Sequence, residues 1–159
     1  MRIAIVSDIH GNLDAFEQVL ADIDRSDIDD IVSLGDNIGY GPQPEEVVEL
    51  IQARRIDSVI GNHELAVKHP KYMSWFNPVA RESLEKTIDL LSDRTLEYIA
   101  AQKSYILQYG CRFVHGFPPD SALIYLFQIP DHRIQKEIEQ LDEQICFVGH
   151  THMLEMISY

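Results

Sequence analysis

Residues 3–12 read IAIVSDIHGN, four apolar residues followed at once by a polar cluster that contains glycine. An apolar run of this length is typical of a strand that is buried on both faces. In open α/β sheets, ligands bind beyond the carboxyl ends of such strands, which is where this polar cluster lies. The stretch therefore predicts an α/β fold with a functional site at its strand ends.

The same pattern recurs four times further along the chain. Apolar runs at 31–34, 59–60, 113–114 and 146–148 end in the clusters GDN, GNHE, HG and GHTH. Each cluster taken alone is explained by an ordinary turn, because Gly-Asp and Gly-Asn are common turn dipeptides. Five clusters at five strand ends instead favour one shared crevice, lined by Asp8, His10, Asp36, Asn62, His63, His115, His150 and His152.

Helical patterns separate the strands. Residues 13–23 carry apolar side chains at a 3.6-residue spacing behind an asparagine, which predicts a helix with an asparagine N-cap. Further helices are expected to begin at Pro44 and Pro78, since proline favours the first helical turn. Two more helical stretches are expected at 92–99 and at about 131–141. Strands that alternate with helices predict parallel pairing in a layered α/β fold.

Residues 105–114 follow a different pattern. Two short apolar runs there flank the turn residues Tyr109 and Gly110, which predicts a β-hairpin. Part of the sheet structure is therefore expected to be antiparallel.

Composition limits the function further. The 159 residues include 26 acidic and 13 basic side chains, for a formal net charge of −13. This length predicts a single domain over residues 1–159. The acidic balance argues against long nucleic acids and anionic membrane surfaces as partners, since both require Lys and Arg. No stretch resembles a signal peptide or a spanning helix, so we expect a cytoplasmic protein in which Cys111 and Cys146 are neighbouring buried thiols.

The side chains of the five clusters are suited to metal binding. They offer carboxylates, imidazoles and one amide oxygen but no thiolate, a set that suits divalent ions such as Mn, Fe, Zn or Ni. Seven such ligands are more than one tetrahedral ion uses. They divide between two ions if one carboxylate bridges the pair.

In this order, the clusters resemble the motifs of the calcineurin-like metallophosphoesterase superfamily, and in particular a compact prokaryotic branch that is phosphodiesterase-like. The resemblance extends from residue 3 to residue 152 and rests on Asp8-Ile9-His10, Gly35-Asp36, Gly61-Asn62-His63-Glu64, His115-Gly116 and Gly149-His150-Thr151-His152. It implies an α/β/β/α sandwich of mixed sheets, with metal ligands at the C-terminal ends of strands.

The resemblance also implies a role for each residue. Asp8, His10 and His152 would hold one metal ion, Asp36 would bridge, and the second ion would take Asn62, His115 and His150. His63 would assist the leaving group as a shared hydroxide attacks the phosphorus of a small or nucleotide-like phosphodiester. A phosphomonoesterase or a dinucleoside-polyphosphate hydrolase is the alternative within enzymes. A non-catalytic metal-binding scaffold is the alternative from another class, and the intact His63 argues against it.

Two departures from the superfamily pattern bear on substrate and fold. Residues 38–41 read IGYG, where the eukaryotic Ser/Thr phosphatases of the superfamily carry an Asp-Arg-Gly, so a protein phosphatase is disfavoured. The superfamily fold normally continues beyond its last histidine motif, whereas this sequence stops seven residues after His152. We therefore expect the C-terminal strands to be lacking and one sheet edge to be exposed, which leaves a homo-oligomer open.

Three further features have two interpretations each. Tyr72, Trp75 and Phe76 are expected to pack in the core, with stacking on a nucleobase or an aryl group as the alternative. Tyr40 either borders the substrate or simply occupies a turn. Glu64 either orients His63 or faces solvent.

Overall fold

The first three strands form a parallel sheet. The computed structural model describes residues 1–158, and its first sheet has the order β1-β2-β3, with β1 at Ile3–Val6, β2 at Asp30–Ser33 and β3 at Asp57–Ser58. Ile3 pairs with Asp30 and Val32 with Asp57, both in parallel register. The third strand was predicted two residues later, at 59–60. Val59 there forms only an isolated bridge with Lys103.

The remaining strands form a second, mixed sheet with the order β4-β5-β6. β4 (Tyr105–Gln108) and β5 (Cys111–Val114) make the predicted antiparallel hairpin, and β6 (Ile145–Val148) pairs with β5 in parallel. Both cysteines are free, in agreement with the sequence prediction. Within residues 1–158, β6 is the last strand of this sheet.

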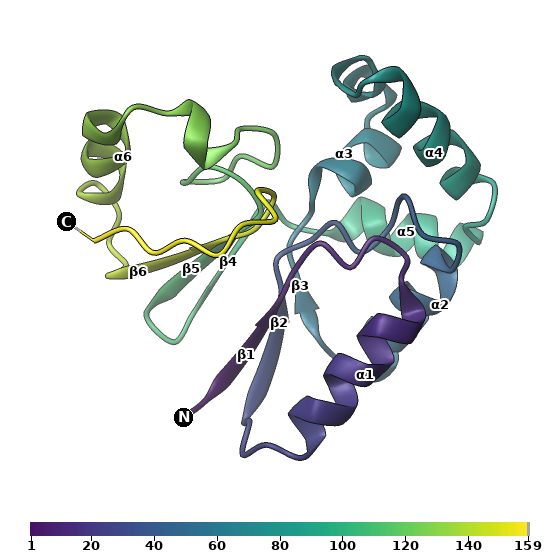
Figure 1. Cartoon of the computed structure of the whole chain (residues 1–159), viewed down its shortest axis with the longest axis horizontal. Helices are drawn as coiled ribbons and strands as arrows, with labels where there is room; N and C mark the ends of the chain where they lie inside the picture. The colour runs from purple at the N-terminus through teal and green to yellow at the C-terminus, as the bar shows by residue number, and fades with distance from the viewer. Residues whose placement is uncertain (159) are drawn as a thin grey trace.

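The helices cover the two outer faces of the paired sheets. Helices α1 (Leu13–Asp24) and α2 (Pro44–Ala53) lie on the side of the first sheet, and α6 (Asp131–Ile138) lies on the opposite side, beyond the second sheet (Figure 1). The predicted α/β/β/α layering is therefore confirmed. α6 ends three residues before the predicted position, at Ile138.

Helix starts follow local capping chemistry. The Asn12 side chain accepts a hydrogen bond from the Ala15 N–H at 3.1 Å and begins α1, as predicted. Asn77 and Ser92 act in the same way at α4 (Pro78–Ile88) and α5 (Asp93–Ala101). The sequence analysis missed α3 (Asn62–Lys68) and the 3-10 helices η1 (Pro70–Trp75) and η2 (Leu126–Gln128).

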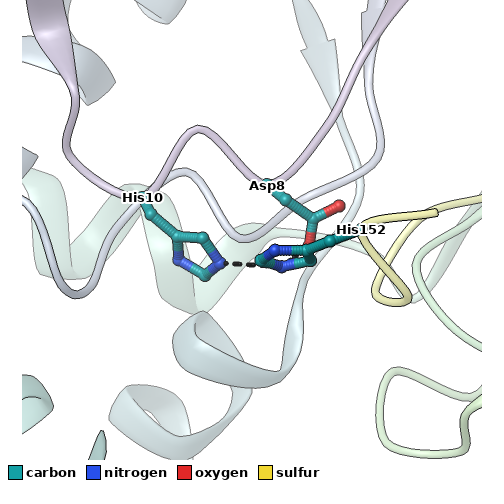
Figure 2. Close-up of side chains that lie close together, drawn as sticks. All are labelled: Asp8, His10 and His152. Carbon is teal, nitrogen blue, oxygen red and sulfur yellow. Dashed lines mark hydrogen bonds and ion pairs between the residues drawn. The ribbon is translucent and has the colours of Figure 1, made fainter.

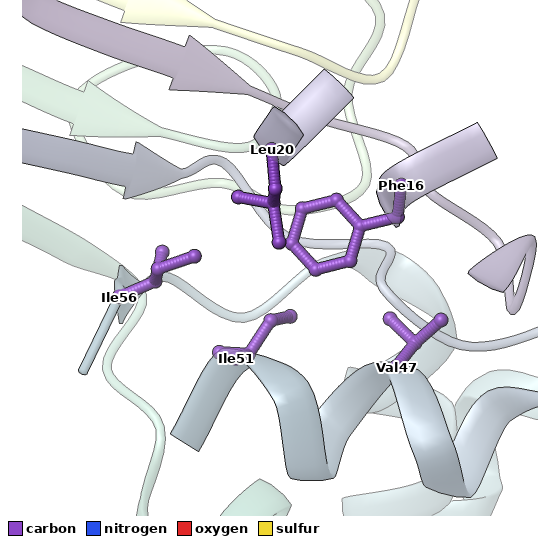
Figure 3. Packing of buried hydrophobic residues seen from close by; sticks show 5 residues of the cluster. All are labelled: Phe16, Leu20, Val47, Ile51 and Ile56. Carbon is purple, nitrogen blue, oxygen red and sulfur yellow. The ribbon is translucent and has the colours of Figure 1, made fainter. Parts of the chain in front are cut away.

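Three apolar clusters hold the layers together. Between α1, α2 and the first sheet lies the cluster of Phe16, Leu20, Val47, Ile51 and Ile56 (Figure 3). A second cluster joins the two sheets through Val32, Leu34, Val59, Cys111 and Phe113. A third joins α2, α3, α4 and α5 through Ile38, Val48, Ala66, Leu84 and Ile99. Among residues 1–158, no helix is long and apolar enough to cross a membrane.

Candidate metal centre

The strand-end loops turn sharply through left-handed backbone. Asp8 after β1 and Asp36 after β2 both have positive φ, at +55° and +52°. Three predicted ligand histidines do the same, with φ of +50° at His10, +66° at His150 and +53° at His152. L-residues adopt this region at a cost of about 1 kcal/mol or more, and such strain gathers at functional sites. The loops therefore hold five predicted ligands in conformations that local propensity alone does not favour.

The first group of ligand atoms contains Asp8, His10 and His152 (Figure 2), with one donor atom from each within 4.8 Å of the others. His152 Nε2 lies 3.3 Å from both Asp8 Oδ1 and His10 Nε2. His10 Nδ1 lies 3.0 Å from the carbonyl oxygen of Ile38, which can only accept, so Nδ1 carries the proton and Nε2 presents its lone pair to the group.

The second group contains Asp36, His115 and His150 and is buried. His115 Nε2 lies 3.3 Å from Asp36 Oδ2, 3.2 Å from His150 Nδ1 and 3.0 Å from the amide oxygen of Asn62. The carbonyl oxygen of Leu34 faces His115 Nδ1 at 2.7 Å and leaves Nε2 for the group. These are the four side chains that were predicted to surround the second ion and its bridge.

Asp36 lies between the two groups. Its Oδ2 atom is 3.3 Å from His115 Nε2 and 3.9 Å from His10 Nε2, one histidine from each group. Its Oδ1 atom accepts a hydrogen bond from the His63 backbone N–H at 2.9 Å. Burial raises the pKa of Asp36, but the imidazoles of His115, His63 and His10 outweigh burial and hold the pKa well below its usual range.

The donor atoms fit a pair of cations. Lone pairs that converge within 4.8 Å repel one another unless a proton or a metal ion lies between them. Asp8 Oδ1 and His150 Nε2 are buried and accept or donate no hydrogen bond among residues 1–158. Burial lowers the pKa of His115, but the Asp36 carboxylate outweighs burial and raises this pKa to about 9. Without a metal ion, a proton on His115 therefore offsets the negative charge of Asp36.

His63 lies in the first turn of α3, beside both groups. Its ring is buried and lies 4.8 Å from the rings of His10 and Tyr40 and 4.9 Å from that of Phe76, measured between centroids. His63 Nδ1 has no hydrogen-bond partner. Burial, together with the neighbouring imidazoles, lowers the pKa of His63 to about 4. A donor atom of His63 also lies within 4.8 Å of donor atoms of His10 and Asp36, so its catalytic rather than ligating role stays a prediction.

The family model of the calcineurin-like phosphoesterase superfamily domain matches residues 1–159. The chain belongs to this superfamily. It is 32% identical over 156 residues to an uncharacterized protein of Methanocaldococcus jannaschii, MJ0912, and the match covers 95% of this chain and 62% of that protein.

Solved structures of calcineurin-like fold agree with this assignment. A metallophosphoesterase from Sphaerobacter thermophilus is 41% identical with a TM-score of 0.77, over 96% of this chain and 61% of that chain. A putative diadenosine tetraphosphatase is 25% identical with a TM-score of 0.60, over 83% and 54% of the two chains. The hypothetical protein PH1004 from Pyrococcus horikoshii OT3 shares the fold, with a TM-score of 0.77 and 20% identity. The match covers 92% of this chain and 68% of that chain. The chain thus spans about three fifths of the length of the Methanocaldococcus jannaschii protein and of the Sphaerobacter thermophilus metallophosphoesterase.

Within this calcineurin-like centre, Glu64 neither faces solvent nor orients the His63 ring, the two roles that the sequence predicted. It is only 1% exposed, and its carboxylate accepts no hydrogen bond from the His63 ring. Instead its carboxylate oxygens accept hydrogen bonds from four backbone N–H groups at N···O distances of 2.7–3.2 Å. The donors are Asp36, Asn37, Ile38 and Gly61. Burial and the Asp36 carboxylate raise the pKa of Glu64 to about 7, against these N–H groups, which favour the ionised form.

A cavity of about 490 Å³ adjoins the centre, and aromatic residues line it. Tyr72 and Phe76 pack against the third apolar cluster, as predicted, but Trp75 is 66% exposed, so core packing is wrong for that residue. Tyr40 is 53% exposed and lines the cavity, which favours the interpretation that it borders a substrate. The sequence analysis missed Tyr125, whose ring stacks on that of His150 at 3.7 Å and 16°. No motif surrounds this tyrosine, so only the fold reveals it.

Proposed function

We propose that this chain carries the catalytic centre of a dinuclear-metal-dependent phosphoesterase that acts on diesters of small or nucleotide-like groups. The position of Asp36 supports this most directly, because its Oδ2 atom lies near one histidine of each ligand group. Membership of the calcineurin-like superfamily supports metal-dependent phosphoester hydrolysis as the reaction class.

Seven side chains would bind the two metal ions. Asp8, His10 and His152 would hold one ion, Asp36 would touch both, and the other ion would be held by Asn62, His115 and His150. When bound, two divalent ions lower the pKa of water and neutralise charge on the phosphate group. His10 after β1 and His115 after β5 are oriented by hydrogen bonds to the backbone carbonyls of Ile38 and Leu34, which fix the imidazole tautomers.

His63 would act on the substrate itself. It lines the cavity beside Asp36 and Asn62, where a phosphoryl or leaving-group oxygen would lie. Phe76 and Tyr40 pack on its ring and keep its orientation. Since burial keeps the imidazole neutral, one ring N–H remains to donate a hydrogen bond to that oxygen as negative charge develops.

Hydrolysis of bis(4-nitrophenyl) phosphate and 4-nitrophenyl phosphate, with Mn²⁺ or with EDTA, tests the proposal. We expect Mn²⁺-dependent diester hydrolysis that falls about 100-fold or more in His63→Ala. His132→Ala is the matched control, because this histidine is exposed on α6, remote from the ligand groups. Metal binding without turnover of either ester would contradict the proposal and favour the scaffold alternative.

A second candidate is hydrolysis of a dinucleoside polyphosphate. The resemblance to a putative diadenosine tetraphosphatase supports it, at 25% identity over 83% of this chain. Faster turnover of diadenosine tetraphosphate than of any simple diester would favour this activity, whereas a monoester preference in the nitrophenyl assay would favour the phosphomonoesterase alternative. A small phosphoester is the expected partner in either case. The chain is acidic, whereas binding of a long nucleic acid requires basic side chains.

A further inference from the structure

Five aromatic side chains line the cavity at the candidate metal centre, and Trp75 and Phe127 are the most exposed of them. Trp75, the last residue of η1, is 66% exposed, and Phe127 in η2 is 64% exposed. Both line the same cavity as Asp36 and His150. Exposed apolar side chains that gather around one cavity mark a binding surface.

Continuous ring contacts support one wall of this cavity. The Tyr125 ring stacks on that of His150 at 3.7 Å and 16°, and it also stacks on that of Phe127 at 4.9 Å and 26°. The three rings therefore form a column that runs from a candidate metal ligand to an exposed phenyl face. Because each ring is held by the one before it, Phe127 is placed before any ligand binds.

A second part of the lining comes from η1 and the residues that follow it. The Phe76 ring meets His63 edge-on at 4.9 Å and 88°, and the Trp75 ring meets Tyr72 at 6.0 Å and 75°. Tyr72 and Phe76 pack on the third apolar cluster, so they support Trp75 from within the fold. Trp75 and Phe127 therefore line the same cavity, each supported by rings of its own part of the fold.

The charge of the lining limits what the cavity can hold. Among residues 1–158, those that line the cavity include no lysine or arginine. One phosphate group has a place at the metal centre, but a second phosphate farther along the cavity would meet no lysine or arginine among the described lining residues. The rest of the substrate would meet mainly aromatic faces, and base–ring stacking suits every nucleobase because each base has a π-face.

We propose that Trp75 and Phe127 form the walls of a base-binding site for a substrate with a single phosphate group, a nucleoside monophosphate ester. This inference rests on the proposed function for the position of the phosphate, and it adds the chemical class of the remaining part. A site for a single phosphate group also favours the phosphodiesterase over the polyphosphate hydrolase, because the substrate of the hydrolase carries further phosphates that the cavity lining would not neutralise.

The intrinsic fluorescence of Trp75 tests the base site directly, because it is the one tryptophan in the sequence. With Zn²⁺ present, we expect AMP to quench the emission saturably and ribose 5-phosphate, which has the same phosphate but no base, to leave it unchanged. ADP is expected to bind no tighter than AMP. Equal quenching by AMP and ribose 5-phosphate, no quenching by either, or markedly tighter binding of ADP would overturn the proposal.

Substitution of the second ring provides a matched test. Phe127→Ala should weaken AMP binding about 10-fold, the order of one base–ring stack, while Trp75 still reports the binding. Tyr109→Ala removes an exposed ring on the β4–β5 turn and should leave AMP binding unchanged. Both positions are exposed, so far-ultraviolet circular dichroism should show an intact fold. Unchanged AMP affinity in Phe127→Ala would overturn the role of that ring.

A hydrolysis assay in parallel separates failure of this site from failure of the proposed function. Methyl 4-nitrophenyl phosphate carries no nucleoside, so its metal-dependent hydrolysis reports the metal centre and not the base site. Hydrolysis without base-selective quenching would overturn the base site and keep the phosphoesterase. Base-selective quenching without hydrolysis of this or any nucleotide ester would keep the base site and overturn the phosphoesterase.

Discussion

The Glu64 carboxylate accepts a hydrogen bond from the backbone N–H of Asp36 at 3.0 Å, while the Asp36 carboxylate accepts one from the backbone N–H of His63 at 2.9 Å. The start of α3 and the loop after β2 therefore each hold the other in place. Since Asp36 lies between the two ligand groups, Glu64 acts as a positioning residue for the centre without touching its donor atoms.

We predict that Glu64→Gln destabilises the fold and distorts the centre. A carboxylate accepts all four backbone N–H groups, whereas the amide turns an NH₂ group toward some of them and leaves at least one donor unpaired. The expected loss in the free energy of unfolding is about 3 kcal/mol, measured by urea denaturation. Glu82→Gln is the matched control, because Glu82 is exposed on α4, and its urea midpoint should not change.

Gly39→Ala should disable His63 while the rest of the fold persists. Gly39 has a φ of +89°, and a Cβ atom there would lie 2.1 Å from His63 Nδ1, so the imidazole would have to move. We expect kcat/KM for bis(4-nitrophenyl) phosphate to fall about 100-fold or more. Gly110→Ala has a similar strained φ, +72°, but no neighbour within 4 Å, so it should lose stability and keep its activity. Equal activity in the two variants would refute the requirement for a glycine beside His63.

Metal binding should show two sites that depend on one shared residue. By mass spectrometry of Mn²⁺-loaded protein, we expect two ions per chain in the parent, about one in His152→Ala and close to none in Asp36→Ala. At a free Mn²⁺ concentration 100 times its Kd, each site should add about 2.7 kcal/mol to the free energy of unfolding, which EDTA removes. His132→Ala should bind as the parent does. One ion per chain in the parent would contradict the bridging role of Asp36.

The Cys146 thiol should be inert in the folded protein at mildly basic pH. Burial raises its pKa to about 12, so its thiolate fraction at pH 8 is roughly a thousandfold below that of an ordinary cysteine. Because a thiol of raised pKa gains thiolate only as pH rises, labelling by 5,5′-dithiobis(2-nitrobenzoate) should speed up continuously between pH 8 and 10. In Cys111→Ala, where Cys146 is the single thiol, fast labelling at pH 8 without urea would refute this prediction.

Much of the candidate site was readable from the sequence because its chemistry lies in short local motifs. Apolar runs bury themselves as strands, and the polar cluster after each run must then lie at a strand end. Asp8, Asp36 and His115 accordingly come together from separate strands. Asparagine, serine and proline at helix starts act through neighbours only three residues away, so α1 and α5 begin where predicted.

By itself, then, the sequence determined the α/β layering, the superfamily and the set of candidate ligand side chains, since each depends on residue type and local order. Only the tertiary structure decided that Glu64 is buried under the Asp36 loop, that Trp75 is exposed, and that Tyr125 stacks on His150. The physical reason is range. Burial and ring stacking depend on residues that are 25 or more positions apart and belong to different elements, and no local pattern in the chain encodes which of them meet.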